Sequence, residues 1–151
     1  MERIKERFEF YLNECKKHLT VLKEDLNLLK VRLPLKEKDI KDLTSTGEGL
    51  RILDQIAYRF AKFQESLGRL VRFYLLLKGE SVETLPLVDT INLANRYGFP
   101  VDGELWMELR ILRNSIVHEY PENYGEVATA INRIFQLLPI LERALKFFEN
   151  P

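Results

Sequence analysis

A heptad pattern of apolar residues near the start of the chain constrains its fold more than any other feature. Within residues 3–33 the apolar positions are spaced alternately four and three apart, at Phe8, Leu12, Cys15, Leu19, Leu22, Leu26, Leu29 and Leu33. This spacing predicts one long helix that lies nearly parallel or antiparallel to a partner helix. Pro34 ends the helix, because proline cannot continue the hydrogen-bond ladder.

The rest of the chain predicts four more helices. They cover residues 48–78, 86–97, a segment from the N-cap Asp102 to His118, and residues 123–149, where Pro139 is expected to kink or divide the helix. Residues 34–49 form a polar connector, and no segment has the two-residue alternation of a half-buried strand. We therefore expect an all-α protein, an antiparallel up-and-down bundle of four main helices plus one shorter helix, in a single domain spanning residues 1–151.

Composition places the chain among ordinary globular proteins, with 46% hydrophobic and 30% charged residues. No apolar run approaches the roughly 20 residues that span a bilayer, so we expect a cytoplasmic protein without membrane contact. The single cysteine, Cys15, forms no internal disulfide, and neither zinc spacing nor the Glu-x-x-His pattern of di-iron bundles is present. The sequence therefore predicts no metal and no cofactor.

The net charge is zero, which argues against binding nucleic acid by bulk electrostatics. Residues 51–78, however, carry six Lys or Arg against two acids, so any site for a polyanion is local. The basic residues of that helix form a stripe that is either an electrostatic footprint for RNA or a solvated face: Arg51, Arg59, Lys62 and Arg69, with Arg72 to its side. His18 falls on the polar side of the first helix and is expected at the surface.

Residues 106–120 are the most informative stretch for function. At about 100° per residue, one side of this helix is apolar, with Leu105, Leu109, Leu112 and Ile116. The opposite side collects Trp106, Arg110, Arg113, Asn114, Val117 and His118. Neither arginine has an acid three or four positions away, so both are expected to face something outside their own helix.

Arg113 and His118 together suit the metal-independent cleavage of RNA. A histidine exchanges a proton near neutral pH, and an arginine holds the charge that grows on phosphate oxygens. Because one helix supplies one histidine, a homodimer would supply both the general base and the general acid. Trp106 and Val117 would then lie on the dimer face, and the alternative for Trp106 is to stack on a nucleotide base. The structural alternative is a histidine that stabilises the helix dipole beside ordinary surface arginines.

The segment Arg113-Asn-Ser-Ile-Val-His118-Glu-Tyr120 resembles the signature of HEPN domains, in which arginine, four to six residues and histidine lie near the end of a helix. Its form is similar to the HEPN toxins of bacterial toxin–antitoxin pairs whose antitoxin is a minimal nucleotidyltransferase. The chain length, helical plan and position of the motif before the last helix extend the resemblance weakly to the whole chain.

The resemblance implies a homodimeric endoribonuclease in which Arg113 and His118 are catalytic and Asn114 and Arg110 support them. It also implies that Tyr120, two residues after the histidine, accepts a nucleotide from the antitoxin and that this modification silences the nuclease. A second branch of the same superfamily implies a non-catalytic, nucleotide- or substrate-binding subunit of a nucleotidyltransferase complex. A purely structural helical adaptor is a third possibility.

Overall fold

The computed structural model describes residues 1–118 and 122–149, apart from the side chain of His118. The described elements are α1 (Glu2–Leu28), the 3-10 turn η1 (Lys30–Arg32), α2 (Glu37–Thr44), α3 (Gly47–Leu77), α4 (Leu87–Arg96), α5 (Gly103–His118) and α6 (Tyr124–Glu149). This part of the chain contains no strand, which confirms the all-α class.

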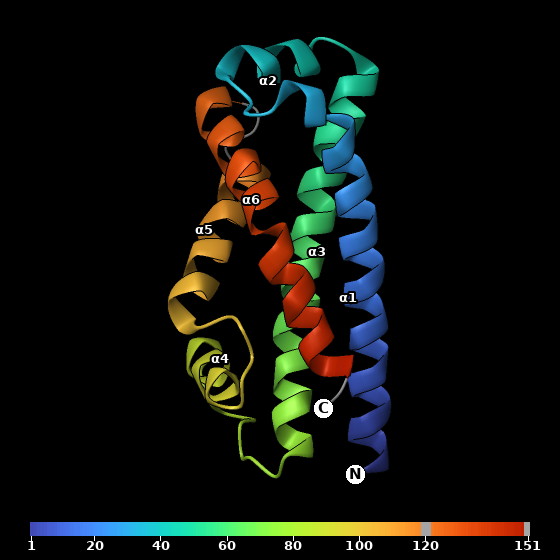
Figure 1. The fold of residues 1–151 in the computed structure, drawn as a ribbon, viewed down its shortest axis with the longest axis vertical. Coiled ribbons are helices and arrows are strands. Elements are labelled where there is room, and N and C mark those ends of the chain that lie inside the picture. Colours follow the sequence, from blue (N-terminus) through green and yellow to red (C-terminus); the bar gives the residue numbers. More distant parts are fainter. Residues whose placement is uncertain (119–121, 150–151) are drawn as a thin grey trace.

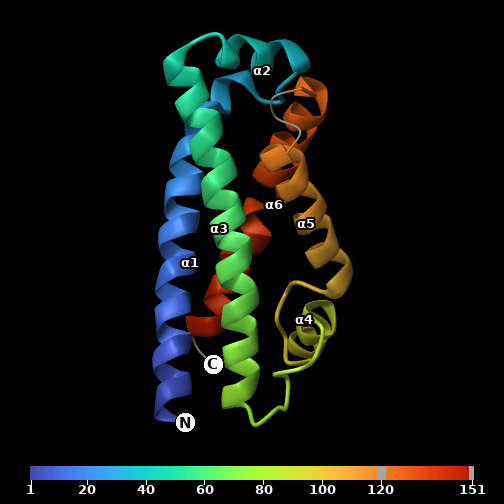
Figure 2. The same ribbon diagram turned by 180° about the vertical axis from the view of Figure 1, so that it is seen from behind.

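Helices α1 and α3 lie side by side along the length of the molecule and run in opposite directions (Figure 1). Helix α6 crosses beside this pair, and α2 covers one end of the molecule. Seen from behind, α3 lies between α1 on one side and α4 and α5 on the other (Figure 2). Helix α5, which carries the arginine–histidine motif, therefore lies beside α3.

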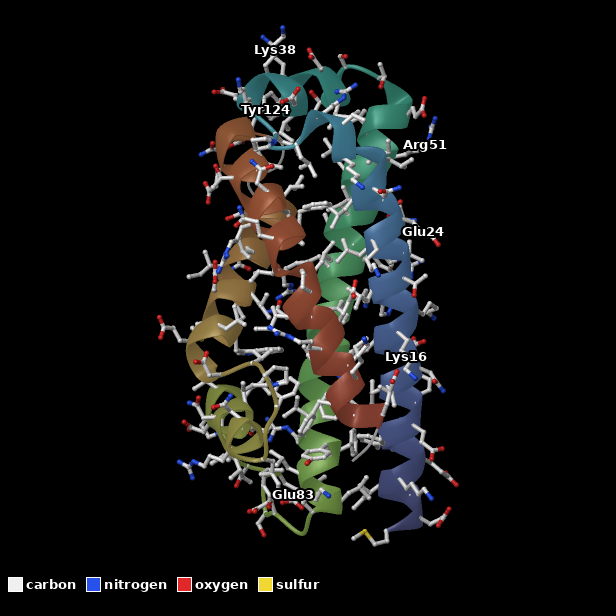
Figure 3. The ribbon with its side chains drawn as sticks, viewed as in Figure 1. Lys16, Glu24, Lys38, Arg51, Glu83 and Tyr124 are labelled. Carbon is white, nitrogen blue, oxygen red and sulfur yellow. The ribbon has the colours of Figure 1, made fainter. Side chains whose placement is uncertain are left out.

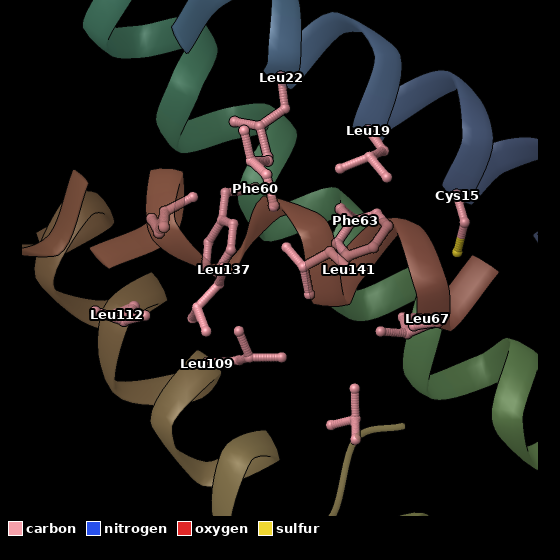
Figure 4. Close-up of a cluster of buried hydrophobic side chains, with 14 of the residues drawn as sticks. Cys15, Leu19, Leu22, Phe60, Phe63, Leu67, Leu109, Leu112, Leu137 and Leu141 are labelled. Carbon is pink, nitrogen blue, oxygen red and sulfur yellow. The ribbon is translucent and has the colours of Figure 1, made fainter. Parts of the chain in front are cut away.

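The core forms where the apolar faces of these helices meet, and charged side chains such as Lys16, Glu24 and Arg51 point outward (Figure 3). Helix α1 ends at Leu28, earlier than predicted, and η1 follows before Pro34. Most of the predicted heptad positions are buried, while Leu12 and Leu33 are only partly covered. The central cluster draws on four helices (Figure 4), with Cys15, Leu19 and Leu22 from α1, Phe60, Phe63 and Leu67 from α3, Leu109 and Leu112 from α5, and Leu137 and Leu141 from α6.

Two local predictions need correction. The polar connector contains a complete helix, α2, and Ile40 and Leu43 bury its apolar side. The backbone before α2 is held to α6, because Leu35 N donates to Asn132 Oδ1 at 2.7 Å and Asn132 Nδ2 donates to Leu35 O at 2.9 Å. Helix α6 is continuous across Pro139, so the proline does not divide it, and the buried leucines on both sides keep the helix packed. The kink at Pro139 stays a prediction.

Candidate functional site

Helix α5 is oriented by contacts at both of its ends. At its start, Asp102 Oδ1 accepts from Leu105 N at 2.8 Å, which confirms the predicted N-cap. Gly103 N donates to Asn92 Oδ1 of α4 at 2.7 Å. Near its other end, Ser115 Oγ donates to Glu126 Oε1 of α6 at 2.9 Å. With its core-facing leucines buried, the helix has a fixed outward face.

A groove of about 550 Å³ lies between α3, α5 and the start of α4. Its walls are Gln64, Glu65, Gly68, Arg69 and Arg72 from α3, Leu87 from α4, and Trp106, Arg110 and Arg113 from α5. Four guanidinium groups against one carboxylate make this a cationic groove. It therefore combines charges from α5 with charges from the basic stripe of α3.

The four arginines differ in how much of their hydrogen-bonding capacity is already used. Arg72 Nη1 donates to the carbonyls of Val82 and Leu85, so this side chain ties down the connection that follows α3. Arg69 donates to Tyr11 Oη at 3.2 Å and lies 3.8 Å from a carboxylate oxygen of Glu65.

Arg110 and Arg113 are exposed and make no hydrogen bond or ion pair with any side chain that the structure describes. The nearest acid on their own helix, Glu108, instead binds Arg133 of α6 through both carboxylate oxygens. This hydrogen bond lowers the pKa of the Glu108 carboxyl and keeps it charged. Arg110 and Arg113 therefore present their guanidinium groups to the groove, ready for an anion.

Trp106 does not lie on an exposed dimer face, and that prediction was wrong. Its side chain is only 2% exposed, because α5 packs against α3 as well as α6 and so buries a second sector of its surface. Gly68 permits this close approach, since an added Cβ would lie 3.1 Å from Leu87 Cδ2 and 3.4 Å from Trp106 Cη2. One edge of the indole contributes to the groove wall.

Other apolar residues of α5 are exposed. Val117 is 36% exposed, as expected for a residue outside the core. Met107 and Ile111, which the sequence reading did not single out, are also exposed, and Ile111 reaches 62%. Asn114 is exposed on the same helix. The three apolar side chains, Met107, Ile111 and Val117, are called the α5 apolar surface below.

The structure describes only part of the predicted motif. His118 is the last residue of α5, and its side chain lies outside the described residues, as does Tyr120 entirely. Of the predicted site residues on α5, the structure describes the side chains of Arg110, Arg113 and Asn114. Arg110 and Arg113 line the groove.

The basic stripe of α3 does not act as one surface. Arg59 is half-buried, and its Nη1 donates to Nδ1 of His18 at 3.0 Å, so only the remaining members of the stripe are open to a ligand. His18 itself is buried between α1 and α3, contrary to the prediction that it lies at the surface. Burial, together with the neighbouring Arg59 charge, lowers the pKa of His18.

Sequence reasoning missed Gln64, Gly68 and Arg72 as members of the groove. Gln64 offered a usable signal, because it is a polar residue next to Phe63 in the broad apolar sector of α3. Gly68 interrupts the same sector and marks the point where α5 comes close. Neither position could be assigned to a groove before the partner helix was known.

Comparisons with known proteins do not extend this picture: no family model, curated protein or solved structure matches the chain significantly. Within residues 1–118 and 122–149, no three His, Cys, Asp or Glu side chains are grouped as metal ligands. No helix in those ranges is long and apolar enough to cross a membrane.

Proposed function

We propose that this chain is a HEPN-type toxin, a metal-independent endoribonuclease that acts as a homodimer and is controlled by a cognate minimal nucleotidyltransferase antitoxin. The proposal includes a fold in which α1, α3, α5 and α6 form an antiparallel four-helix bundle with α4 as the shorter helix. One observation carries it: Arg110 and Arg113, both without a partner side chain among the described residues, line a cationic groove on the helix that ends at His118.

The proposed reaction needs one base, one acid and one fixed cation. The base removes the proton of a ribose 2′-hydroxyl, and the 2′-oxygen forms a bond to the adjacent phosphorus. The bond from phosphorus to the 5′-oxygen breaks, the acid gives its proton to that oxygen, and the products are a 2′,3′-cyclic phosphate and a 5′-hydroxyl. Arg113 stabilises the charge on the non-bridging oxygens, and His118 supplies the proton transfers.

The homodimer is proposed because the reaction needs two proton-transfer groups and one chain brings a single suitable histidine. The chain has two histidines, and His18 is buried in contact with Arg59 and does not line the groove. His118 of a second copy is then the remaining source of the second proton-transfer group. The α5 apolar surface supports this arrangement, because exposed apolar side chains beside a site gain stability by packing against a partner.

Tyr120 is proposed as the regulatory position on the basis of the sequence motif alone. A nucleotide esterified to its hydroxyl adds phosphate charge beside the groove, and repulsion of the RNA backbone would then inhibit cleavage. Mass spectrometry after co-expression with a minimal nucleotidyltransferase should show a nucleotide mass on Tyr120. The same mass on another residue would refute this assignment.

A second function, a non-catalytic nucleotide-binding subunit of a nucleotidyltransferase complex, is favoured by a specific feature. Among the described residues, none that follows Arg113 in α5 lines the groove. A nucleotide could bind there with no proton transfer at all. Under this alternative, Arg113→Ala weakens nucleotide binding, but the wild type cleaves no RNA. An adaptor would show neither property.

The proposed nuclease is tested by comparing Arg113→Ala with Arg143→Ala. Arg143 is an exposed arginine of α6 outside the groove, so it controls for the loss of one surface charge. We expect Arg113→Ala to lower the rate of RNA cleavage by a factor on the order of a hundred, as for removal of a group that stabilises transition-state charge. Equal rates for the two variants would contradict the role of Arg113.

A further inference from the structure

Aromatic and arginine side chains gather where the first part of α1 packs on α3, next to the groove. Arg69 belongs to both places, because it lines the groove and its Nη1 donates to Tyr11 Oη of α1 at 3.2 Å. The Tyr11 ring stacks on Phe73 of α3, with the ring centroids 5.7 Å apart and the planes at 11°. Arg7 reaches the same tyrosine. The guanidinium carbons of Arg7 and Arg69 lie 5.9 and 5.7 Å from the centroid of its ring, so cations of two helices meet there.

Four exposed arginines therefore follow one another across three helices, and they are called the arginine row below: Arg113 and Arg110 of α5, Arg69 of α3 and Arg7 of α1. The first three line one groove, and Tyr11 connects Arg69 with Arg7. The order of the helices agrees with this course, since α3 lies between α5 and α1 (Figure 2). The positive charge of the groove thus continues onto α1.

The charges of the row are only weakly compensated. Arg7 has no acid three or four positions away, as is also true of the two arginines of α5, and it forms no ion pair with a described side chain. Glu65, the one carboxylate of the groove wall, lies 3.8 Å from both Arg69 and Lys62. Exposed contacts of this length contribute little. Arg7 and Arg69 repel each other beside one ring, and bound phosphates would remove this repulsion.

Phe10 adds an exposed aromatic ring at the α1 end of the row. Its ring centroid lies 5.1 Å from that of Tyr11, with the planes at 84°, and the residue is 52% exposed. The heptad position is filled by Phe8, which is buried, so the helix packing does not require an aromatic residue at position 10. One exposed apolar residue is ordinary by itself. Aromatic rings next to a track of cations, however, are the usual combination in proteins that bind an unpaired nucleic acid strand.

We propose that an unpaired RNA strand runs from the α3/α5 groove along the arginine row to α1, where one of its bases stacks on Phe10. The inference rests on the proposed function in taking RNA as the ligand, and it extends the site beyond the groove to a second contact. A duplex does not fit this contact, because its bases are already paired and stacked on one another and cannot turn out onto a ring. Strandedness, and not charge alone, therefore governs binding.

The test measures the binding of a labelled oligouridylate whose 2′-oxygens are methylated, so that the chain cannot use them to cleave the strand. A strand of about 12 nucleotides lies within the range of known single-stranded sites, and fluorescence anisotropy gives its Kd for the full chain. Phe10→Leu keeps an apolar side chain but removes the ring. It should raise the Kd by a factor on the order of ten, as for the loss of one stacked base. Leu28→Ala, at an exposed apolar residue at the other end of α1, is the matched control and should leave the Kd unchanged.

A second variant tests the arginine row without changing an aromatic residue. Arg7→Ala should reduce the slope of log Kd against log salt concentration by about 0.7, the effect of one lost phosphate contact with a single strand. Arg143→Ala, at an exposed arginine of α6 outside the row, should keep the wild-type slope. Equal slopes for Arg7→Ala and the wild type would overturn the continuation of the strand onto α1.

Two further outcomes would overturn the stacked base. The first is a Kd that Phe10→Leu leaves unchanged. The second is a duplex of the same length whose affinity falls in Phe10→Leu as much as that of the single strand, because the ring would then contribute without stacking on an unpaired base. Competition by polyglutamate as effective as that by the unlabelled strand would overturn the assignment to nucleic acid.

Failure of this path and failure of the proposed function are distinguishable, because the methylated strand is bound and not cut. Cleavage of ordinary RNA by a chain whose binding does not depend on Phe10 or Arg7 refutes the path and leaves the nuclease standing. Binding that depends on both residues, in a wild-type chain that cleaves no RNA, refutes the nuclease and supports the path.

Discussion

Replacing Gln64 with leucine should raise the stability of the fold, because it removes a buried amide that lacks a partner. The Gln64 side chain is only 4% exposed, and its Nε2 has no partner among the described residues. The folded protein therefore bears an unsatisfied donor, which costs about 1–3 kcal/mol. Leucine has nearly the same volume and an equally good helix propensity, so it removes that cost without leaving a cavity.

We expect the free energy of unfolding to rise by about 1–2 kcal/mol after part of the gain is lost to imperfect packing. For a chain of this length, that corresponds to an increase in Tm of about 2–4 °C per kcal/mol. Urea unfolding followed by circular dichroism measures the change, with the m-value expected to stay constant. Gln136→Leu, at an exposed position, should change stability by less than about 0.5 kcal/mol.

A loss of stability in Gln64→Leu would refute the reasoning. It would mean that the Gln64 amide makes hydrogen bonds that stabilise the fold.

Two further predictions concern other parts of the molecule. The pKa of His18 is lower in the folded protein than in the unfolded chain. The contribution of neutral His18 to stability is therefore fully present above a pH of about 6.5, and the free energy of unfolding should fall as the pH drops from there toward the folded-state pKa. Urea unfolding from pH 7.5 to 5 should show a smaller loss of stability for His18→Gln than for the wild type, and an identical loss would contradict this role. Ile111→Glu places a charge on the α5 apolar surface and should convert the proposed dimer to a monomer in sedimentation experiments. Val31→Glu, at a 94% exposed side chain of η1, should leave the proposed dimer intact. A dimer that persists in both variants would place the interface elsewhere.

Periodicity predicted the fold well where a helix has one dominant neighbour. The heptad positions of α1 are buried against α3 as expected. Periodicity failed where a helix has two neighbours. His18 lies just outside the α1 seam, and Arg59 of α3 contacts it there. Trp106 is covered because Gly68 lets α3 approach a second side of α5.

The candidate site was predictable in its charges but not in its shape. The absence of acids three or four positions from Arg110 and Arg113 correctly indicated that their guanidinium groups would stay unpaired with the described side chains. The groove itself depends on contacts between α3 and α5, whose residues lie some 40 positions apart in the sequence. No local pattern reveals that Gln64 and Trp106 would lie in the same wall.

The most direct measurement of the central claim is the rate of RNA cleavage by the unmodified wild type and by His118→Ala, in a metal-chelating buffer. The wild type should release fragments that end in 2′,3′-cyclic phosphate, and His118→Ala should be slower by a factor of about 10² or more while remaining helical and dimeric. A wild type that leaves every RNA intact, or a His118→Ala variant that cleaves at the wild-type rate, would contradict the account.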